Sequence, residues 1–169
     1  MGTLRQLKPE DADRMYEWLQ NEDITRYFRF SGMKLSLDSV KNFIKNANST
    51  TSRHYAITNE HDQYMGTVSL KNIDPLNKNA EYAIALHMDA IGNGYARFAT
   101  DQILKIGFGE LGLHRIYLNV LSTNHRAMRF YEKYGFIFEG ESREHLIQQG
   151  KFQSVKWYSL LDTDRLFNE

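Results

Sequence analysis

Apolar side chains recur along the chain with two different periods, and each change of period marks an expected element. A short apolar strand covers 3–7. Pro9 then suits the first position of a helix, whose apolar residues continue at helical spacing to Leu19. Ser36 is a suitable N-cap for a second helix, with an apolar stripe that extends to Ala47. The first part of the chain is therefore expected to form one strand followed by two helices.

Alternation of apolar and polar residues predicts strands in the middle of the chain. The expected strands cover 54–58, 64–71 and 81–88. A polar turn separates the first two strands. The segment 72–79 is expected to be a loop.

The second half of the chain combines both periods. A glycine-containing turn leads into a helix with apolar positions from Ala96 to Ile106. A strand at 115–121 and a helix at 124–133 follow. Two closing strands are expected at 136–140 and 155–161, with a turn at Gln149-Gly150 between them. The order of elements predicts an α+β fold with a mixed sheet, and 169 residues fit one domain.

Composition narrows the function classes. Lys+Arg and Asp+Glu both total 21, which argues against a nucleic-acid-binding protein and against a polybasic membrane-surface protein. The chain has no cysteine, so disulfides, thiolate metal sites and a cysteine nucleophile are excluded, and its histidines have no metal-ligand spacing. No apolar run approaches the roughly 20 residues of a membrane span, and the N-terminus lacks the apolar core of a signal peptide. The expected location is the cytoplasm.

The turn from Gly92 to Ala96 is the first candidate site. Glycines before a helix let backbone N–H groups approach a phosphate, and the helix N-terminus adds partial positive charge. The same pattern also occurs in tight turns that bind nothing. The turn alone therefore leaves both interpretations open.

A second motif supports the phosphate interpretation. The segment Ile91-Gly92-Asn93-Gly94-Tyr95-Ala96 resembles the acetyl-CoA motif of the GNAT superfamily, Arg/Gln-x-x-Gly-x-Gly/Ala. Further along, Asn124-x-x-Ala127-x-x-x-Tyr131-x-x-x-Gly135-Phe136 resembles the second GNAT motif, with the strand at 115–121 between the two. The start, Leu4-Arg5-x-Leu7-x-x-Glu10-Asp11-Ala12, is similar to the branch that includes ribosomal-protein N-terminal and spermidine acetyltransferases. Ile91 departs from the family pattern, which removes one phosphate-facing side chain but no backbone donor.

The resemblance implies a single GNAT acetyltransferase domain over 1–169. The implied fold is a mixed, mostly antiparallel sheet with a central splayed strand pair and helices on both faces. The implied activity is N-acetyl transfer from acetyl-CoA, a cosubstrate, to a primary amine by direct attack on the thioester, without a metal. The residues expected to bind the cofactor are Leu86, His87, Gly92, Asn93, Gly94, Tyr95, Ala96, Asn119 and Asn124.

Two residues are candidates for catalysis. Tyr131 matches the family tyrosine near the thioester sulfur, where its O–H would protonate the departing thiolate or donate a hydrogen bond to it. Glu81 begins the central strand, where related enzymes often carry an acidic residue that accepts the amine proton directly or through water. The alternatives are a core aromatic and a solvated strand-end carboxylate. His87 is a weaker candidate base, because it lies beside the phosphate turn.

The acceptor is the least determined part of the function. The segment Arg26-Tyr27-Phe28-Arg29-Phe30 is basic and aromatic, where similar polyamine enzymes are acidic. Phe28 and Arg29 are therefore expected to bind a planar or anionic acceptor, such as an amino sugar or a nucleotide-linked amino sugar. A polyamine, a protein N-terminus and a non-catalytic CoA-binding module remain alternatives. The expected partner is a small-molecule amine, and a homodimer stays open.

Overall fold

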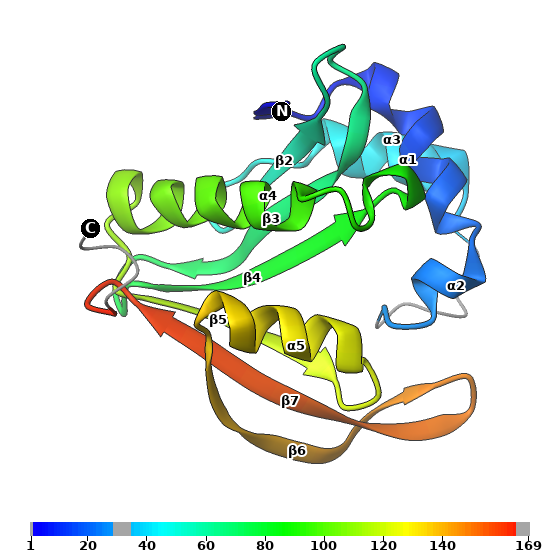
Figure 1. Ribbon diagram of the computed structural model, residues 1–169. Helices are drawn as coiled ribbons and strands as arrows, with labels where there is room; N and C mark the ends of the chain where they lie inside the picture. The colour runs from blue at the N-terminus through cyan, green and yellow to red at the C-terminus, as the bar shows by residue number, and fades with distance from the viewer. Residues whose placement is uncertain (1, 29–34, 165–169) are drawn as a thin grey trace.

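The computed structural model describes residues 2–28 and 35–164, which form a mixed sheet with helices on both faces (Figure 1). The strands are β1 (Leu4–Gln6), β2 (Arg53–Thr58), β3 (Tyr64–Asp74), β4 (Asn79–Leu86), β5 (Arg115–Leu121), β6 (Ile137–Gln148) and β7 (Lys151–Leu161). The α-helices are α1 (Ala12–Leu19), α2 (Glu22–Thr25), α3 (Leu37–Lys45), α4 (Tyr95–Leu104) and α5 (His125–Tyr134). Short 3-10 helices η1 (Pro9–Asp11) and η2 (Met88–Ala90) precede α1 and α4, and a π-helical turn, η3 (Lys105–Glu110), extends α4.

The sheet has the strand order β1-β2-β3-β4-β5-β7-β6. All neighbouring strands are antiparallel except β4 and β5, which are parallel and joined through α4, the crossover that a parallel pair requires. Residues of α1 and α3 form one apolar cluster with the sheet, and residues of α4 and α5 contribute to the other. The predicted fold class, a mixed and mostly antiparallel sheet with helices on both faces, is confirmed.

Local sequence signals account for most helix boundaries. The Ser36 hydroxyl accepts a hydrogen bond from the Ser39 N–H at 3.1 Å and caps α3, as predicted. The side chain of Asn124 caps α5 in the same way. The one-turn helix α2 was not predicted, because four residues are too short to show a helical period. Its N-cap is Asn21, which accepts a hydrogen bond from the Asp23 N–H at 2.9 Å.

The segment 72–79, predicted to be a loop, is partly strand. β3 continues to Asp74, which pairs with Asn79 at the start of β4. The strand register shifts between Lys71 and Asp74. Asn72 takes a positive φ of 49°, a conformation that asparagine tolerates better than most residues. The extra residue forms a β-bulge, which a period-two pattern does not reveal.

Three further strand predictions were wrong in length. β4 ends at Leu86 rather than at residue 88, because the His87 side chain accepts a hydrogen bond from the Asp89 N–H and begins η2. β6 and β7 extend well beyond the predicted closing strands, to the predicted turn at Gln149-Gly150. Both turn residues have positive φ, 50° and 73°, as in a two-residue type I′ hairpin.

The central strands β4 and β5 separate soon after they pair. Only Asn79–Arg115, Ala80–Ile116 and Glu81–Tyr117 are paired between them. Beyond Glu81, β4 remains paired with β3 on its other side, and β5 remains paired with β7. The facing edges of β4 and β5 are therefore without a strand partner, and Figure 1 shows the two strands diverging toward their C-terminal ends. The predicted splayed pair is present.

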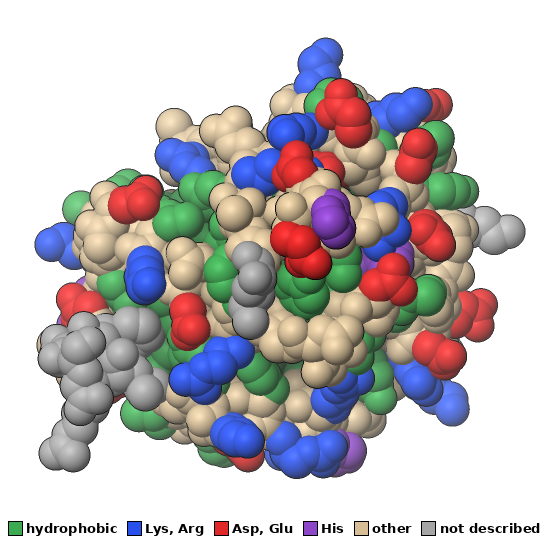
Figure 2. Space-filling view, turned by 45° about the horizontal axis from the view of Figure 1, so that its top comes forward, with side chains coloured by type: hydrophobic (Ala, Val, Ile, Leu, Met, Phe, Trp, Pro, Cys, Tyr) green, Lys and Arg blue, Asp and Glu red, His purple; other side chains and the backbone are tan. Residues whose placement is uncertain are grey.

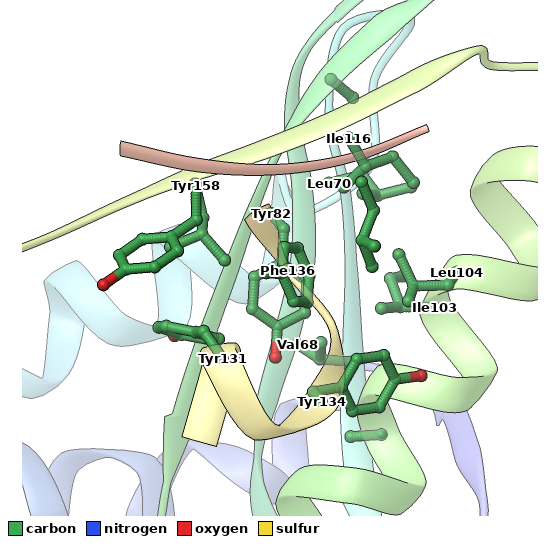
Figure 3. Close-up of a cluster of buried hydrophobic side chains, with 14 of the residues drawn as sticks. Val68, Leu70, Tyr82, Ile103, Leu104, Ile116, Tyr131, Tyr134, Phe136 and Tyr158 are labelled. Atoms are coloured by element: carbon green, nitrogen blue, oxygen red, sulfur yellow. The ribbon is translucent and has the colours of Figure 1, made fainter. Parts of the chain in front are cut away.

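Aromatic side chains from β4, α5 and β7 pack together beside the divergence (Figure 3). The rings of Tyr82 and Tyr131 meet edge to face, with centroids 6.1 Å apart and an interplanar angle of 89°. Tyr131 also contacts Phe136 at 5.6 Å and Tyr158 at 6.3 Å. Edge-to-face pairs of this kind add stability beyond the area they bury. The cluster holds α5 against the sheet next to the open strand edges.

Candidate active site

A cavity of about 950 Å³ passes through the sheet where β4 and β5 diverge. Its walls include Trp18 of α1 and Phe43 of α3 from one face of the sheet, and Ala96 of α4 and Ala127 of α5 from the other. Large cavities with a few polar groups are the usual place for small-molecule chemistry. We call the part lined by α1, α2, α3 and β2 the acceptor end, and the part lined by α4 and α5 the phosphate end.

The phosphate end is built around the N-terminus of α4. Gly94 is the N-cap, in the left-handed conformation with φ 81°, and carries no side chain to cap the helix. Within the described residues, the first-turn amides of α4 have no hydrogen-bond partner. Gly92, also at positive φ, lines the cavity, and an added Cβ there would meet nothing within 4 Å. Free amides at a helix N-terminus beside an open glycine turn are suited to bind a pyrophosphate.

The structure brings most of the predicted cofactor residues to this cavity. The predicted residues that line it are Leu86, Gly92, Gly94, Ala96, Asn119 and Asn124. Three others do not line it. His87 is buried with 2% of its surface exposed, Asn93 donates to the Asp89 carbonyl oxygen, and Tyr95 packs against the core.

Tyr131 lines the cavity and is 8% exposed. Within the described part of the chain, its hydroxyl has no hydrogen-bond partner. By contrast, the hydroxyls of Tyr82, Tyr134 and Tyr158 lie within hydrogen-bond distance of Thr100, Asp101 and Glu132. Burial raises the pKa of Tyr131 above its ordinary value, so its hydroxyl keeps its proton at neutral pH. The residue therefore combines a buried, protonated O–H with access to the cavity.

Glu81 also lines the cavity, at the last residue pair before the strands separate. The Asn119 side chain donates to its Oε1 at 3.0 Å, and the Asn72 side chain donates to its Oε2 at 2.9 Å. The Lys71 ammonium lies 3.7 Å from Oε1. Only 12% of the Glu81 side chain is exposed, so this is not a solvated strand-end carboxylate. The bulge residue Asn72 and the predicted cofactor residue Asn119 therefore hold Glu81 in a defined orientation.

The charged side chains of the cavity wall are mostly basic. Among the described residues, the basic ones are Arg26, Lys71, Arg97 and Arg126, and the carboxylates are Asp23 and Glu81. Both carboxylates already have a cation of their own, since Asp23 lies 3.3 Å from Arg26 and Glu81 lies 3.7 Å from Lys71. The remaining two arginines are at the phosphate end, on α4 and α5. On the outer surface both signs of charge occur across the visible face, in keeping with the zero net charge (Figure 2).

The acceptor end contains polar residues that the sequence analysis did not identify. His54 lies with its Nδ1 2.7 Å from the Ser69 hydroxyl, and its ring meets the Phe43 ring edge to face at 4.8 Å. Thr67 lines the same wall. Burial, and then the charge of Lys71, lower the pKa of His54 to about 4, so the imidazole is neutral at physiological pH. No motif marks these residues, because strand pairing between β2 and β3 brings them together.

The pKa of His54 predicts a loss of stability in mild acid. The unfolded chain binds a proton on this side chain below its ordinary pKa of 6.5, whereas the folded chain resists protonation until about pH 4. The free energy of unfolding therefore has its full value above pH 6.5 and falls as the pH decreases toward 4. We expect His54 to contribute about 1–2 kcal/mol to this fall, after allowance for solvent contact. Urea unfolding between pH 4 and 7 should show a smaller fall for His54→Gln, and an equal fall would contradict the prediction.

The two predicted acceptor residues have different outcomes. Phe28 lines the cavity and packs its ring against Trp18, with centroids 5.4 Å apart. Arg29 lies outside the described residues. Arg26 and Tyr27 of the same basic, aromatic segment also line the cavity. A further residue that contacts this segment, Gln148, gave no signal in the sequence because it lies at the other end of the chain.

Comparisons with known proteins are in keeping with this site. The family model described as an acetyltransferase (GNAT) domain matches residues 3–137. The spermidine N(1)-acetyltransferase of Vibrio cholerae serotype O1 is 29% identical over 97% of this chain and 95% of its own length. YdaF of Bacillus subtilis, provisionally named a ribosomal N-acetyltransferase, is 28% identical over 94% of this chain and 90% of its own length.

A solved structure matches nearly the whole chain. The spermidine N-acetyltransferase from Vibrio cholerae, crystallised in complex with CoA and spermine, superposes with a TM-score of 0.88 at 28% identity and covers 97% of both chains. Within the described residues, no helix is long and apolar enough to cross a membrane. The similarity extends over both motifs and both ends of the cavity.

Proposed function

The chain belongs to the acetyltransferase (GNAT) domain family and is an acetyl-CoA-dependent N-acetyltransferase, and from that premise we propose that it acetylates the amino group of a small, sugar-like molecule. The observation that carries the acceptor class is the acceptor end of the cavity. There, the described wall includes the neutral polar or aromatic side chains of Trp18, Phe28 and His54, and its two carboxylates already have cationic partners.

The phosphate end has the groups needed to hold the cosubstrate. The free first-turn amides of α4 and the guanidinium groups of Arg97 and Arg126 suit the phosphates of CoA. The unpaired edge of β4 beyond Glu81 suits the amide-containing arm of the cofactor, which would add to the sheet like a short strand. When bound there, acetyl-CoA supplies the acetyl thioester.

We assign Tyr131 and Glu81 to the two proton movements of the reaction. The amine loses a proton as it attacks the thioester carbon, and Glu81 accepts it directly or through water. Asn72 and Asn119 orient the carboxylate by donating one hydrogen bond to each oxygen. The sulfur leaves with the bonding electron pair, and the Tyr131 hydroxyl gives it a proton. Asn124 caps α5, the helix that carries Tyr131.

The acceptor end favours a molecule with several hydroxyl groups. Neutral His54 and the hydroxyls of Ser69 and Thr67 are able to exchange hydrogen bonds with hydroxyl groups without a net charge. Trp18 and Phe28 offer apolar faces that suit a ring. An amino sugar, free or nucleotide-linked, has both features.

A polyamine is the second candidate, because relatives named spermidine acetyltransferases match the chain over most of its length. A polyamine carries several ammonium groups, which need carboxylates nearby when they leave water. In the described cavity wall, Asp23 and Glu81 are already paired with Arg26 and Lys71. We therefore place the polyamine below the amino sugar as an acceptor.

A release assay for free CoA distinguishes the two acceptor classes. The panel contains amino sugars, nucleotide-linked amino sugars, spermidine, spermine and peptides with free N-termini, each at several concentrations. We expect the best amino sugar to exceed spermidine in kcat/KM by at least about tenfold, or about 1.4 kcal/mol in transition-state stabilisation. A higher kcat/KM for spermidine than for every sugar would overturn the proposed acceptor and leave the acetyltransferase assignment intact.

A further inference from the structure

The hairpin formed by β6 and β7 reaches the acceptor end from the opposite end of the chain. In Figure 1 its tip lies near α2. At the tip, Gln148 is 6% exposed, and its side-chain nitrogen donates to the carbonyl oxygens of Arg26 and Phe28, the latter at 2.8 Å. Both amide hydrogens of one side chain are thus used on the segment that lines the cavity.

We propose that Gln148 is a positioning residue for the acceptor, which holds the segment 26–28 in the shape that binds substrate. Arg26, Tyr27 and Phe28 follow the one-turn helix α2, and their side chains line the cavity. Two local backbone hydrogen bonds hold this segment, from the Arg26 N–H to the Glu22 carbonyl oxygen and from the Phe28 N–H to the Thr25 carbonyl oxygen. The two bonds from Gln148 add a connection between its carbonyl oxygens and the β6–β7 hairpin.

The register of the hairpin explains why the Gln148 side chain faces the segment 26–28. Side chains alternate between the two faces of a strand, and Ile147 is 63% exposed whereas Gln148 is buried. The tight turn at Gln149-Gly150 pairs Gln148 with Lys151. A slip by one residue would turn the glutamine outward and the isoleucine inward. The register of the hairpin therefore determines whether the carbonyls of 26–28 have a donor.

Kinetics of two variants separate hydrogen bonding from packing. Gln148→Met keeps the length and apolar volume of the side chain but cannot donate, and Gln148→Glu puts a carboxylate opposite two carbonyl oxygens. We expect the acceptor KM to rise about tenfold for Met and further for Glu, with the acetyl-CoA KM and the kcat at saturating acceptor within about twofold of wild type. If Gln148→Met keeps the wild-type acceptor KM, the residue only fills space and the inference is wrong. Gln153→Glu on β7 is the control, since its side chain has no hydrogen bond within the described residues.

A second measurement does not require turnover. The chain has two tryptophans, and Trp18 packs on Phe28 at 5.4 Å. In a Trp157→Phe background, Trp18 is the sole tryptophan and reports on the segment 26–28. We expect Gln148→Glu to increase acrylamide quenching of Trp18 by about twofold or more, with Gln153→Glu unchanged. Equal quenching in all three proteins would overturn the inference.

The kinetic experiment depends on the proposed function, because it requires turnover of an acceptor, whereas the quenching experiment does not. If the wild-type protein acetylates none of the amines, the proposed acceptor class fails and the quenching result still decides the role of Gln148. If the wild type is active and neither Gln148 variant shifts the acceptor KM, the inference fails while the proposed function stands. The two failures are therefore distinguishable.

Discussion

Tyr131→Phe should lower kcat at least about tenfold and leave the affinity for acetyl-CoA nearly unchanged. The substitution removes a hydroxyl that has no hydrogen-bond partner within the described residues and keeps the ring that packs on Tyr82 and Phe136. A thiolate is a tolerable leaving group in water, so the expected minimum of about tenfold lies below the about 10²–10⁴-fold range typical of general acid catalysis. Each tenfold corresponds to about 1.4 kcal/mol of barrier. Steady-state kinetics with the best acceptor and equilibrium binding of acetyl-CoA measure both quantities.

Tyr134→Phe is the matched control for this experiment. It lies on the same helix, in the same aromatic cluster, but its hydroxyl donates to Asp101 at 2.6 Å and it does not line the cavity. We expect this variant to lose some stability and to keep its kcat. If the two variants have the same kcat while the chemical step limits the rate, Tyr131 is a packing residue.

The pH dependence of the same kinetics distinguishes the role of Tyr131 from that of Glu81. Glu81→Gln removes the acceptor of the amine proton, so its defect should shrink as the pH rises and more of the free amine is present. The defect of Tyr131→Phe has no such link to the free amine, because the tyrosine acts on the leaving sulfur and not on the amine. A Glu81→Gln defect that does not change with pH would remove the assignment of Glu81 as the base.

Gly94→Asp should abolish the stabilisation of the protein by acetyl-CoA. At 100 times its dissociation constant, a ligand adds about 2.7 kcal/mol to the free energy of unfolding. The aspartate would place a carboxylate beside the free amides of α4, where the phosphates are expected. It would also force a side chain into a left-handed position with φ 81°. Thermal unfolding with and without acetyl-CoA measures the difference.

Gly94→Ala separates the charge from the backbone strain. Both variants carry a Cβ at the left-handed position, so both should be less stable than wild type without ligand. Only the aspartate carries the charge, so the alanine variant should keep part of its thermal shift with acetyl-CoA. No shift for the wild-type protein at saturating acetyl-CoA would contradict the placement of the phosphates at this turn.

The parts of the site that the sequence predicted depend on local geometry. The cap at Asn124 and the glycine turn before α4 each involve residues that are close in the chain, so their spacing is visible in the sequence. Tyr131 was found through the second motif, Glu81 through its place at the start of the central strand, and the structure brings both to one cavity. The splayed pair followed from the resemblance, since no periodicity shows where two strands will separate.

The features that were not predicted depend on contacts between residues that are far apart in the sequence. Gln148 and Arg26 are 122 residues apart in the chain, and no local pattern relates them. His54 faces Ser69 because β2 pairs with β3 in a particular register. The bulge at Asn72 breaks the alternation of β3, so the strand was predicted to end too early. Each case depends on which elements lie side by side in the fold, and local patterns in a single sequence do not reveal that arrangement.

The divergence of β4 and β5 also has a consequence for how the chain assembles. Short connections join β2 to β3 and β3 to β4, and a tight turn joins β6 to β7, so each half of the sheet contains a set of local strand pairs. Three residue pairs join β4 to β5 across a connection that includes all of α4 and its π-helical turn. Contacts that close a long connection form slowly, because the entropy of closure precedes the gain in contact energy. The junction between the two halves is thus expected to form later in folding than the local pairs β2–β3, β3–β4 and β6–β7 that it joins.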